Sequence, residues 1–367
     1  MSNIKIETLT PVHIGSGETL QYGNDFVKGK EDGSSVLGII DAGKIMKLIG
    51  YENIDRWVTA IERKEFTDKI VKVYAPDTTI EDYAKRTILE WSKVKETDTL
   101  KEQIHDGLGR PYIPGSSIKG AIRTAVLASL ANDISGIEDK LKDKKGKVNA
   151  KTIEAELFGK DPNSDVFRFL QVGDAYFGDN YEVAIRMVNI NERRNQSFWD
   201  ESKSQLIEAI VSGDETTFQL KLNIDSYEKV KSKVHPIPIC MSSINSLFQA
   251  INKHTQMLVE QEIDYWNDRK TDDDKGKIDL YLENINNILQ TIQSCEKGKS
   301  CLLRIGHGSG WRFITGAWTE SLDNFKNVVV PIARPENDKY VEYSFPKTRR
   351  VDDECTLLGF VKLTVLG

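Results

Sequence analysis

The chain has 367 residues, of which 39% are hydrophobic and 29% charged, which is typical of a globular protein with a sizeable core. It contains no run of ~20 apolar residues that would span a bilayer. The basic and apolar regions of a signal peptide are also missing. The net charge of −6 excludes a protein that coats nucleic acid by bulk electrostatics, because phosphate binding needs clustered Lys and Arg. The four cysteines form no C-x-x-C pair, so we expect a reduced, cytoplasmic protein without membrane contact.

The N-terminal region predicts strands followed by helices. Ile4–Leu9 alternates apolar and polar residues as a half-buried strand does, and it leads into Pro11–Gly17, where two glycines indicate a tight loop. Val36–Ile40 predicts a second strand. A polar, helical region follows from about Ala42 to Ser92.

The middle of the chain predicts one well-defined helix. Gly107–Gly115 is loop-like, with two prolines, and Ser116 and Ser117 then offer N-cap hydroxyls. Lys119 and Arg123 lie four residues apart and therefore share a more exposed face of the helix. The apolar residues at helical spacing, which we expect in the core, are Ile118, Ala121, Ile122, Ala125, Val126 and Leu130.

The second half predicts more strands and a helical hairpin. Strand patterns cover Phe167–Phe177, Glu182–Val188 and Phe218–Ile224. Two amphipathic helices, Ile244–Trp266 and Ile278–Ile292, are joined by a charged turn. Short strands return at the end of the chain.

This mixture predicts an α+β fold built from ferredoxin-like, RNA-recognition-like units with helical insertions. We expect residues 1–238 to form a ferredoxin-like core with a helical insertion at about 42–106. Residues 239–300 would form an inserted helical hairpin, and residues 301–367 would complete the core with strands and a glycine-rich loop.

The segment Gly115–Gly120 looks like a phosphate loop but is not a Walker A motif, because Lys119 precedes the second glycine. Free N–H groups at a helix start still favour anions, and Lys119 and Arg123 would add positive charge. An ordinary capped helix with solvated basic residues explains the spacing equally well.

Arg304–Arg312 is a second glycine-rich segment. It is not a dinucleotide fingerprint, because Trp311 stands where that motif needs glycine. Alternate glycines expose N–H groups that can hold phosphates, and Trp311 offers a surface on which a base can stack, as suits single-stranded RNA. The alternative is a glycine-rich hairpin whose tryptophan is core.

Weaker candidates remain. Lys347-Thr-Arg-Arg350 is a short basic cluster that a solvated turn would also explain. His13 has the chemistry of a general acid or base, but a structural role is the simpler interpretation, since no second histidine lies nearby in sequence. His105, His235 and His254 look structural, no ligand spacing indicates zinc, and no G-x-S-x-G elbow is present.

Three segments together resemble the repeat-associated mysterious proteins (RAMPs) of CRISPR systems: Pro11–Gly17, Tyr112–Arg123 and Gly306–Gly310. Within RAMPs, Phe345–Val351 followed by Leu358–Leu363 resembles the family of the fifth Csm subunit of type III-A complexes. The resemblance implies a RAMP fold and a subunit that caps the backbone filament at the crRNA 3′ end and assists crRNA maturation. It implies as partners the crRNA, the backbone and small helical Csm subunits, and host nucleases.

Motifs and resemblance together give one set of expected RNA contacts and no cofactor or metal: His13, Gly15, Ser16, Ser116, Ser117, Lys119, Arg123, Arg304, Gly306, His307, Gly308, Gly310, Trp311, Arg312, Lys347, Arg349 and Arg350. RAMP backbone subunits cut target RNA with an aspartate in an early loop. Asp25 is the nearest acid here and does not match that position, so we expect no slicing.

Three hypotheses follow. The first is a non-catalytic RNA-binding and assembly subunit. The second is a metal-independent endoribonuclease that processes repeat RNA, with His13 or His307 as acid or base and Lys119 or Arg123 stabilising the phosphate. The third is an α+β interaction module without an RNA role.

Overall fold

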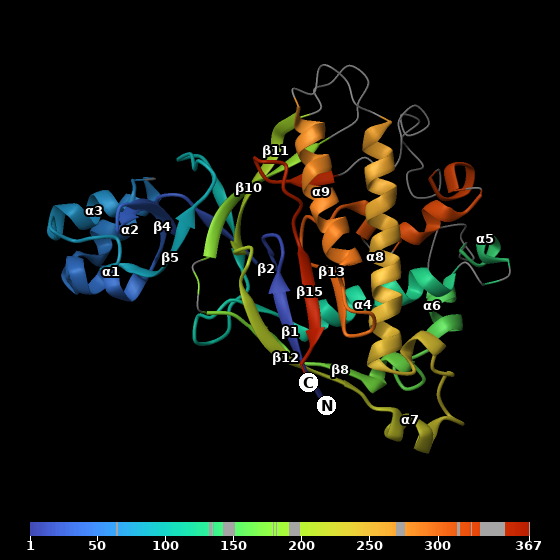
Figure 1. The fold of residues 1–367 in the computed structure, drawn as a ribbon. Helices are drawn as coiled ribbons and strands as arrows, with labels where there is room; N and C mark the ends of the chain where they lie inside the picture. The colour runs from blue at the N-terminus through green and yellow to red at the C-terminus, as the bar shows by residue number, and fades with distance from the viewer. Residues whose placement is uncertain are drawn as a thin grey trace.

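The computed structural model describes the chain except for residues 64, 132–133, 135, 142–150, 179, 181, 191–198, 269–275, 314–315, 324, 331–348 and 367. Helices and strands are mixed along the chain, and the strands gather into two large sheets (Figure 1). Within the described residues, no helix is both long enough and apolar enough to cross a membrane.

The first sheet has five antiparallel strands. Its order is β13 (Ser300–Arg304), β15 (Phe360–Val365), β1 (Ser2–Thr8), β12 (Glu215–Leu222) and β8 (Leu170–Val172). Both β1 and β13 pair antiparallel with β15, which lies between them. These two strands therefore run in the same direction, and the loops that follow them emerge at the same edge of the sheet.

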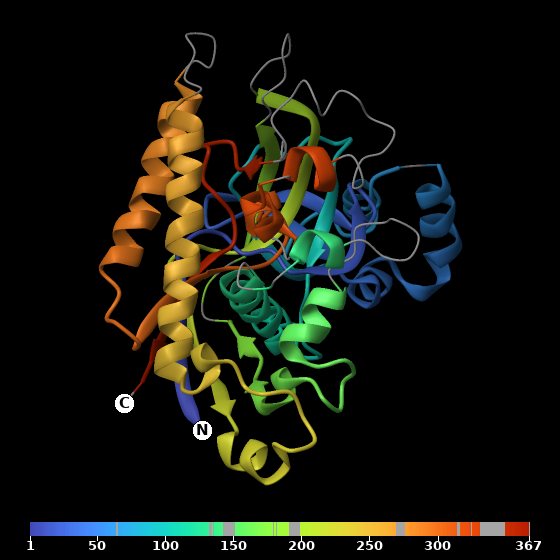
Figure 2. The same cartoon turned by 90° about the vertical axis from the view of Figure 1, so that its right-hand side faces the viewer.

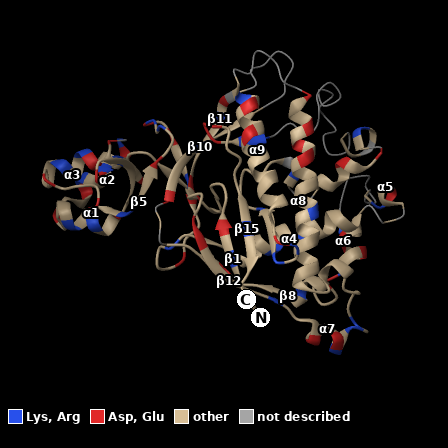
Figure 3. Ribbon diagram, in the orientation of Figure 1, with Lys and Arg blue, Asp and Glu red and all other residues tan. Residues whose placement is uncertain are grey.

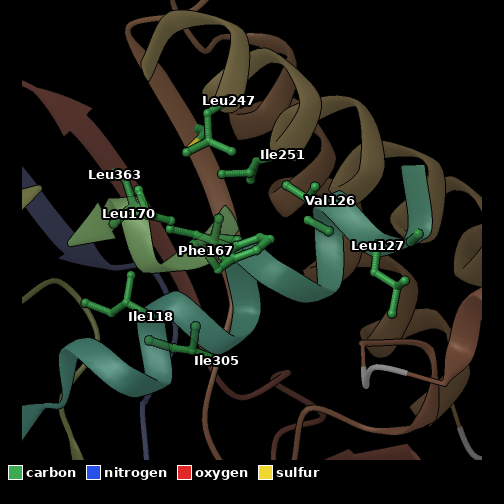
Figure 4. Packing of buried hydrophobic residues seen from close by; sticks show 14 of the residues in the cluster. Ile118, Val126, Leu127, Phe167, Leu170, Leu247, Ile251, Ile305 and Leu363 are labelled. Carbon is green, nitrogen blue, oxygen red and sulfur yellow. The ribbon is translucent and has the colours of Figure 1, made fainter. Parts of the chain in front are cut away.

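Three helices pack beside this sheet: α4 (Gly115–Ala131), α8 (Ile244–Asn267) and α9 (Lys277–Gln293). α8 contacts β13, α4 and α9, and Figure 2 shows α8 and α9 running alongside each other. Apolar side chains from helices and strands meet in one large buried cluster, part of which Figure 4 shows; it includes Ile118, Val126, Leu127, Phe167, Leu170, Leu247, Ile251, Ile305 and Leu363.

The second sheet has eight strands and mixed directions. Its order is β2 (Gly15–Gln21), β6 (Thr99–Gln103), β11 (Trp199–Ile210), β10 (Glu182–Ile190), β5 (Ala84–Glu90), β4 (Ser34–Ile40) and β3 (Phe26–Glu31), with β14 (Arg349–Val351) paired to β10. The pairs β5–β10 and β6–β11 are parallel. Alternate residues pack into separate clusters, so both faces are covered: Ala184 and Leu206 belong to one, Val183 and Ile207 to another.

A helical lobe lies at the far side of this sheet from α8 (Figure 1). It consists of α1 (Ala42–Ile49), α2 (Ile54–Glu62) and α3 (Thr67–Tyr74). Buried Ile45, Trp57 and Val71 pack with Val27 and Val36 of the β3–β4 hairpin.

The remaining elements are short. They are η1 (Tyr51–Asn53), β7 (Tyr112–Ile113), which pairs with β9 (Ala175–Tyr176), α5 (Ile137–Lys140), α6 (Lys151–Phe158), η2 (Val166–Phe169), α7 (Ile224–Val230), η3 (Ile239–Met241), η5 (Trp311–Phe313), η6 (Ala317–Ser321) and the π-helix η7 (Phe325–Val329).

The structure confirms the predicted α+β mixture, the first strand, the helix after Gly115 and the late helical hairpin. The prediction of helix from 42 to 92 is wrong beyond Tyr74, because β5 follows as a strand. Gly15 and Gly17 do not end a strand in a loop; they begin β2, which pairs with β6. The charged turn between α8 and α9 lies mostly outside the described residues, and the domain boundaries stay a prediction.

Candidate nucleic-acid interface

Two loops that are about 290 residues apart in sequence meet at one edge of the first sheet, where β1 and β13 both end. The N–H of His307 donates to the backbone oxygen of His13 over 2.9 Å, and the N–H of Gly359 donates to Pro11. A Cβ atom on Gly306, which has φ +80°, would lie only 2.5 Å from the His13 oxygen. Glycine is therefore required where the two loops touch.

The glycine loop, residues 306–310, has an unusual backbone. Gly306, Gly308 and Gly310 all have positive φ, at 80°, 84° and 74°. Among the described residues, no acceptor is found for the N–H groups of Gly308, Ser309 and Gly310. Successive N–H groups in such a backbone form a concavity that suits anions.

His13 lies beneath this loop and is only 2% exposed. Its Nδ1 is 2.6 Å from the backbone oxygen of Glu208 in β11; since a carbonyl only accepts, Nδ1 carries the proton. Burial lowers the pKa of His13 to about 4, so the ring is neutral near pH 7. His13 thus joins the loop to the second sheet, in agreement with the simpler of its two interpretations.

His307 is exposed above His13, and the two ring centroids are 5.9 Å apart in an edge-to-face arrangement. Arg350 donates from Nη1 to Nε2 of His307 over 2.9 Å. Burial, followed by the positive charges of Arg350 and Lys101, lowers the pKa of His307. Structure thus supplies the second histidine that the sequence neighbourhood lacks, but both rings favour the neutral form.

Arg350 and Lys101 are the cations of this surface. Neither forms an ion pair with a carboxylate in the described part of the chain. Elsewhere the two signs are interspersed, as along α1–α3 and α8 (Figure 3). An Arg and a Lys with no carboxylate partner among the described residues, beside N–H groups that have no acceptor there, make a local phosphate-binding surface possible on an acidic protein.

Three other predicted arginines are buried and occupied within the protein. Arg304 donates from Nε to the Leu358 oxygen over 2.8 Å and lies over two phenylalanine rings. Arg349 and Arg312 both pair with Glu262 of α8. These side chains fasten the C-terminal segment to the core, so we do not carry them into the proposed RNA surface.

Lys347 lies outside the described residues, and of Trp311 only the backbone is described, as the first residue of η5. Ser16 is exposed and donates to Glu102 over 3.1 Å. Asp25 accepts from the N–H of Gln21 over 2.8 Å and so stabilises the turn between β2 and β3.

The start of α4 differs from the expected capped helix. Pro114 accepts from the N–H of Ser117 and Ile118, and Gly115 donates to Asp174 over 2.7 Å. The predicted serine caps are therefore wrong, because Ser116 and Ser117 lie inside the first turn, exposed and half-buried.

The two cations of α4 are partly sequestered. Arg123 pairs with Asp165 at 2.9 Å and Glu154 at 3.1 Å and packs over Phe158 and Phe167. Burial lowers the pKa of Lys119. Arg123 therefore joins α4 to α6 and η2, and Lys119, Ser116 and Ser117 are the helix residues that remain for RNA.

Gln103 connects the two predicted motifs. Its side chain accepts from the N–H of Ile14 over 2.8 Å and donates to the oxygen of Tyr112 over 3.3 Å. Sequence reasoning missed Gln103, Lys101 and Glu208, since each lies inside a strand that no motif marks.

Comparison with known proteins identifies the family. A sequence model of the RAMP superfamily matches residues 5–313. The chain belongs to the RAMP superfamily. This confirms the family resemblance and the associated fold class of ferredoxin-like units.

Individual proteins of similar sequence or fold can also be named. The chain is 24% identical over 312 residues to the "CRISPR system Cms protein Csm5" of Methanocaldococcus jannaschii, covering 81% of this chain but 63% of that protein. The chain thus spans less than two thirds of that relative's length. The fold is similar to that of T. onnurineus Csm5, with a TM-score of 0.68 and 17% identity over 99% of this chain and 100% of the other.

A third similarity is to a chain in a cryo-EM structure of a Csm–crRNA–target RNA ternary complex of a type III-A CRISPR-Cas system. The TM-score is 0.74 and the identity 19%, with both chains covered completely. At this identity the likeness concerns the fold.

Proposed function

We propose that this chain is a non-catalytic crRNA-binding subunit of a type III-A Csm complex, with the glycine loop as its main RNA contact. RAMP membership, the similarity to Csm5 proteins and the fold shared with a chain of a Csm–crRNA complex support this assignment. The observation that carries it is that Arg350 and Lys101, beside the loop, pair with no carboxylate in the described part of the chain.

The surface suits single-stranded RNA better than a duplex. It is local: one loop with free N–H groups, two cations and the exposed ring of His307. Such a site holds one or two phosphates and a stacked base, as single-stranded RNA recognition requires. In this proposal the chain caps the backbone filament at the crRNA 3′ end, contacts the backbone and small helical subunits, and presents the 3′ end to host nucleases for trimming.

The proposal is tested by RNA binding of the full chain. Replacing both Lys101 and Arg350 by alanine removes two phosphate contacts, so the salt dependence of binding to single-stranded RNA should fall by about 1.4 in log–log slope. The control is Lys229→Ala with Lys233→Ala, which removes the same charge from exposed positions at and just after α7. Equal affinities and slopes in wild type and the first variant would place the RNA elsewhere.

Metal-independent endoribonuclease activity is the second candidate, and the proximity of His13 and His307 favours it. General acid–base cleavage requires one protonated group near neutral pH. Burial disfavours the charged form of His13 and lowers the pKa of His307 as well, so the pair is poorly matched to this role.

A cleavage assay on repeat-containing RNA in EDTA separates the two candidates. We expect no cutting by the wild type. Cutting that is lost in His307→Ala, while His235→Ala retains it, would replace the binding proposal with the nuclease.

A further inference from the structure

Away from the glycine loop, the second sheet carries a compact group of ionisable side chains that the RNA proposal does not use. Arg86 comes from β5, Glu102 from β6, and Glu208 from β11. Glu182 begins β10, and His105 follows β6 by two residues. Lys101 and Glu102 are successive residues of β6, so this group and the cations of the RNA surface lie on opposite faces.

Three of these residues have the geometry of a metal site. One potential ligand atom from each of Glu102, His105 and Glu208 lies within 4.8 Å of the other two. The Glu208 side chain is fully buried, and that of Glu102 is 14% exposed. The group is thus screened from solvent far better than a surface cluster of acids.

Glu182 supplies a second, independent observation. It is 7% exposed, and its Oε2 lies 2.8 Å from Nε2 of His105. Its other oxygen, Oε1, is buried and has no hydrogen-bond partner among the described residues. A carboxylate oxygen buried without a donor is costly, and this one belongs to a carboxyl group held against the cluster.

The charges of the group do not balance. Two carboxylates, those of Glu102 and Glu208, share one half-buried guanidinium, that of Arg86, and the carboxyl group of Glu182 pairs with His105. Lys85 lies 3.5 Å from Glu102 but is 46% exposed, so solvent screens it. A divalent cation would offset this excess of carboxyl groups over guanidinium groups.

Arg86 leaves room for a ligand. Glu208 accepts two bonds from Arg86 and one from the N–H of Gln103, at 2.9, 2.9 and 3.0 Å. A carboxylate offers about four lone-pair sites, so Glu208 retains one. Glu102 accepts from Arg86 and Lys85 on Oε1 and only from Ser16 on Oε2, so Oε2 keeps acceptor capacity.

We propose that Glu102, His105 and Glu208 bind a divalent transition-metal ion, with Glu182 orienting His105 and accepting a bond from a water molecule on the ion. Two carboxylates and one imidazole suit Zn²⁺ or Mn²⁺, whereas the nitrogen ligand disfavours Mg²⁺ and Ca²⁺. A carboxylate on the second ring nitrogen of a metal-binding histidine is the usual outer partner. The site ties β6, β10 and β11 together, and it does not depend on the RNA proposal.

Isothermal titration of the EDTA-treated, desalted full chain with ZnCl₂ or MnCl₂ tests the proposal, with MgCl₂ for comparison. We expect one Zn²⁺ or Mn²⁺ per chain and much weaker Mg²⁺ binding. Glu102→Gln and His105→Gln should each weaken binding at least ten-fold, and Glu182→Gln about 10- to 100-fold, as outer partners do. Glu18→Gln, an exposed carboxylate in the neighbouring strand β2, is the control.

Thermal melting without metal establishes that each variant is folded, and Zn²⁺ should raise the Tm of the wild type and the control only. Absence of stoichiometric binding in the wild type overturns the proposal. So does binding that is unchanged in all three variants, since the ion would then occupy cysteines or surface carboxylates elsewhere.

Discussion

Arg349 and Arg350 are adjacent in strand β14, yet they belong to two different regions of the molecule. Successive side chains of a strand point to opposite faces. Arg349 is 6% exposed and forms two hydrogen bonds to Glu262, at 2.9 and 3.0 Å, while its guanidinium stacks on Tyr265. Arg350 is half-buried at the surface, beside His307 and without a carboxylate partner among the described residues.

The comparison shows that neighbouring arginines of one basic cluster can have different roles: Arg349 stabilises the fold, whereas Arg350 in our proposal binds RNA. The Glu262 region is closed: burial opposes ionisation, but Arg349 and Arg312 keep the pKa of Glu262 below its usual value, and Tyr281 and Trp266 donate to the same carboxylate. The glycine-loop region is open: among the described residues, no acceptor is found for the N–H groups of Gly308, Ser309 and Gly310, and Lys101 and Arg350 pair with no carboxylate.

The largest expected effect is a loss of stability when the buried ion pair between Arg349 and Glu262 is removed. Arg349→Met leaves the Glu262 carboxylate buried without its main partner, which costs about 3–5 kcal/mol of stability. Arg350→Met should cost less than about 1 kcal/mol. Urea unfolding of both variants checks this, and Glu262→Gln added to Arg349→Met should recover part of the loss. Equal destabilisation by the two arginine changes would contradict the contrast.

A pH effect of nearly the same size is expected from His13, which is buried beside the glycine loop. Because its pKa in the folded state is about 4, below the ordinary 6.5, the unfolded chain binds the proton first as the pH falls. Stability is complete above about pH 6.5 and decreases by about 3 kcal/mol toward pH 4. The pH dependence of urea unfolding should be smaller in His13→Gln. Identical pH profiles for wild type and His13→Gln would show that His13 titrates normally.

The contact between the two loops can be broken at Gly306. Gly306→Ala combines a positive φ with a Cβ atom 2.5 Å from the His13 oxygen, and we expect a loss of about 2 kcal/mol or more together with weaker RNA binding. Gly17→Ala is the matched control, since its φ is +100° but nothing lies within 4 Å of the added Cβ. Both variants carry the cost of the backbone angle, so thermal melting should give a lower Tm for Gly306→Ala than for Gly17→Ala, and equal Tm values would show that the contact with His13 contributes nothing.

The smallest effect is expected at Arg350, on the proposed RNA surface. Arg350→Ala should weaken binding of single-stranded RNA about ten-fold, which is about 1.4 kcal/mol, and leave folding nearly unchanged. It should also raise the pKa of His307, whose protonation Arg350 disfavours. Fluorescence anisotropy and an NMR titration measure the two effects. Arg168→Ala, an exposed arginine in η2, should change neither.

Sequence patterns predicted β1, β12 and the helices beside the first sheet because each of these elements has one buried face. The predicted strand Phe167–Phe177 is wrong as a single element, because η2 occupies its start and two short strands, β8 and β9, follow. The alternation in β1 and the helical spacing from Ile118 onward mark that face directly. Most of the second sheet was not predicted. Its strands β4 and β10 were recognised, but β11 is covered on both faces and β2 is exposed along nearly all of its length, so neither β11 nor β2 shows a period of two.

The candidate site was predicted in part. The glycine loop and the His13 loop were both recognised as motifs, but their contact depends on β1 and β13 flanking β15, which no local pattern encodes. The division of the arginines was not predictable either, since Glu262 lies about 90 residues before Arg349 in an ordinary amphipathic helix. Spacing likewise gave no sign of His105 joining Glu102 and Glu208, which come together only across strands.

The position of β15 between β1 and β13 has a consequence for the order of events during synthesis. A ribosome makes β1 first, but residues 360–365 must be made before the strand can gain this neighbour. Until then, no strand holds the His13 loop and the glycine loop next to each other, and apolar strand edges are exposed. Sheets closed by such distant pairings fold slowly and are prone to aggregation. The proposed RNA surface thus forms late, and a partner or chaperone that shields β1 in the interval would raise the yield of folded protein.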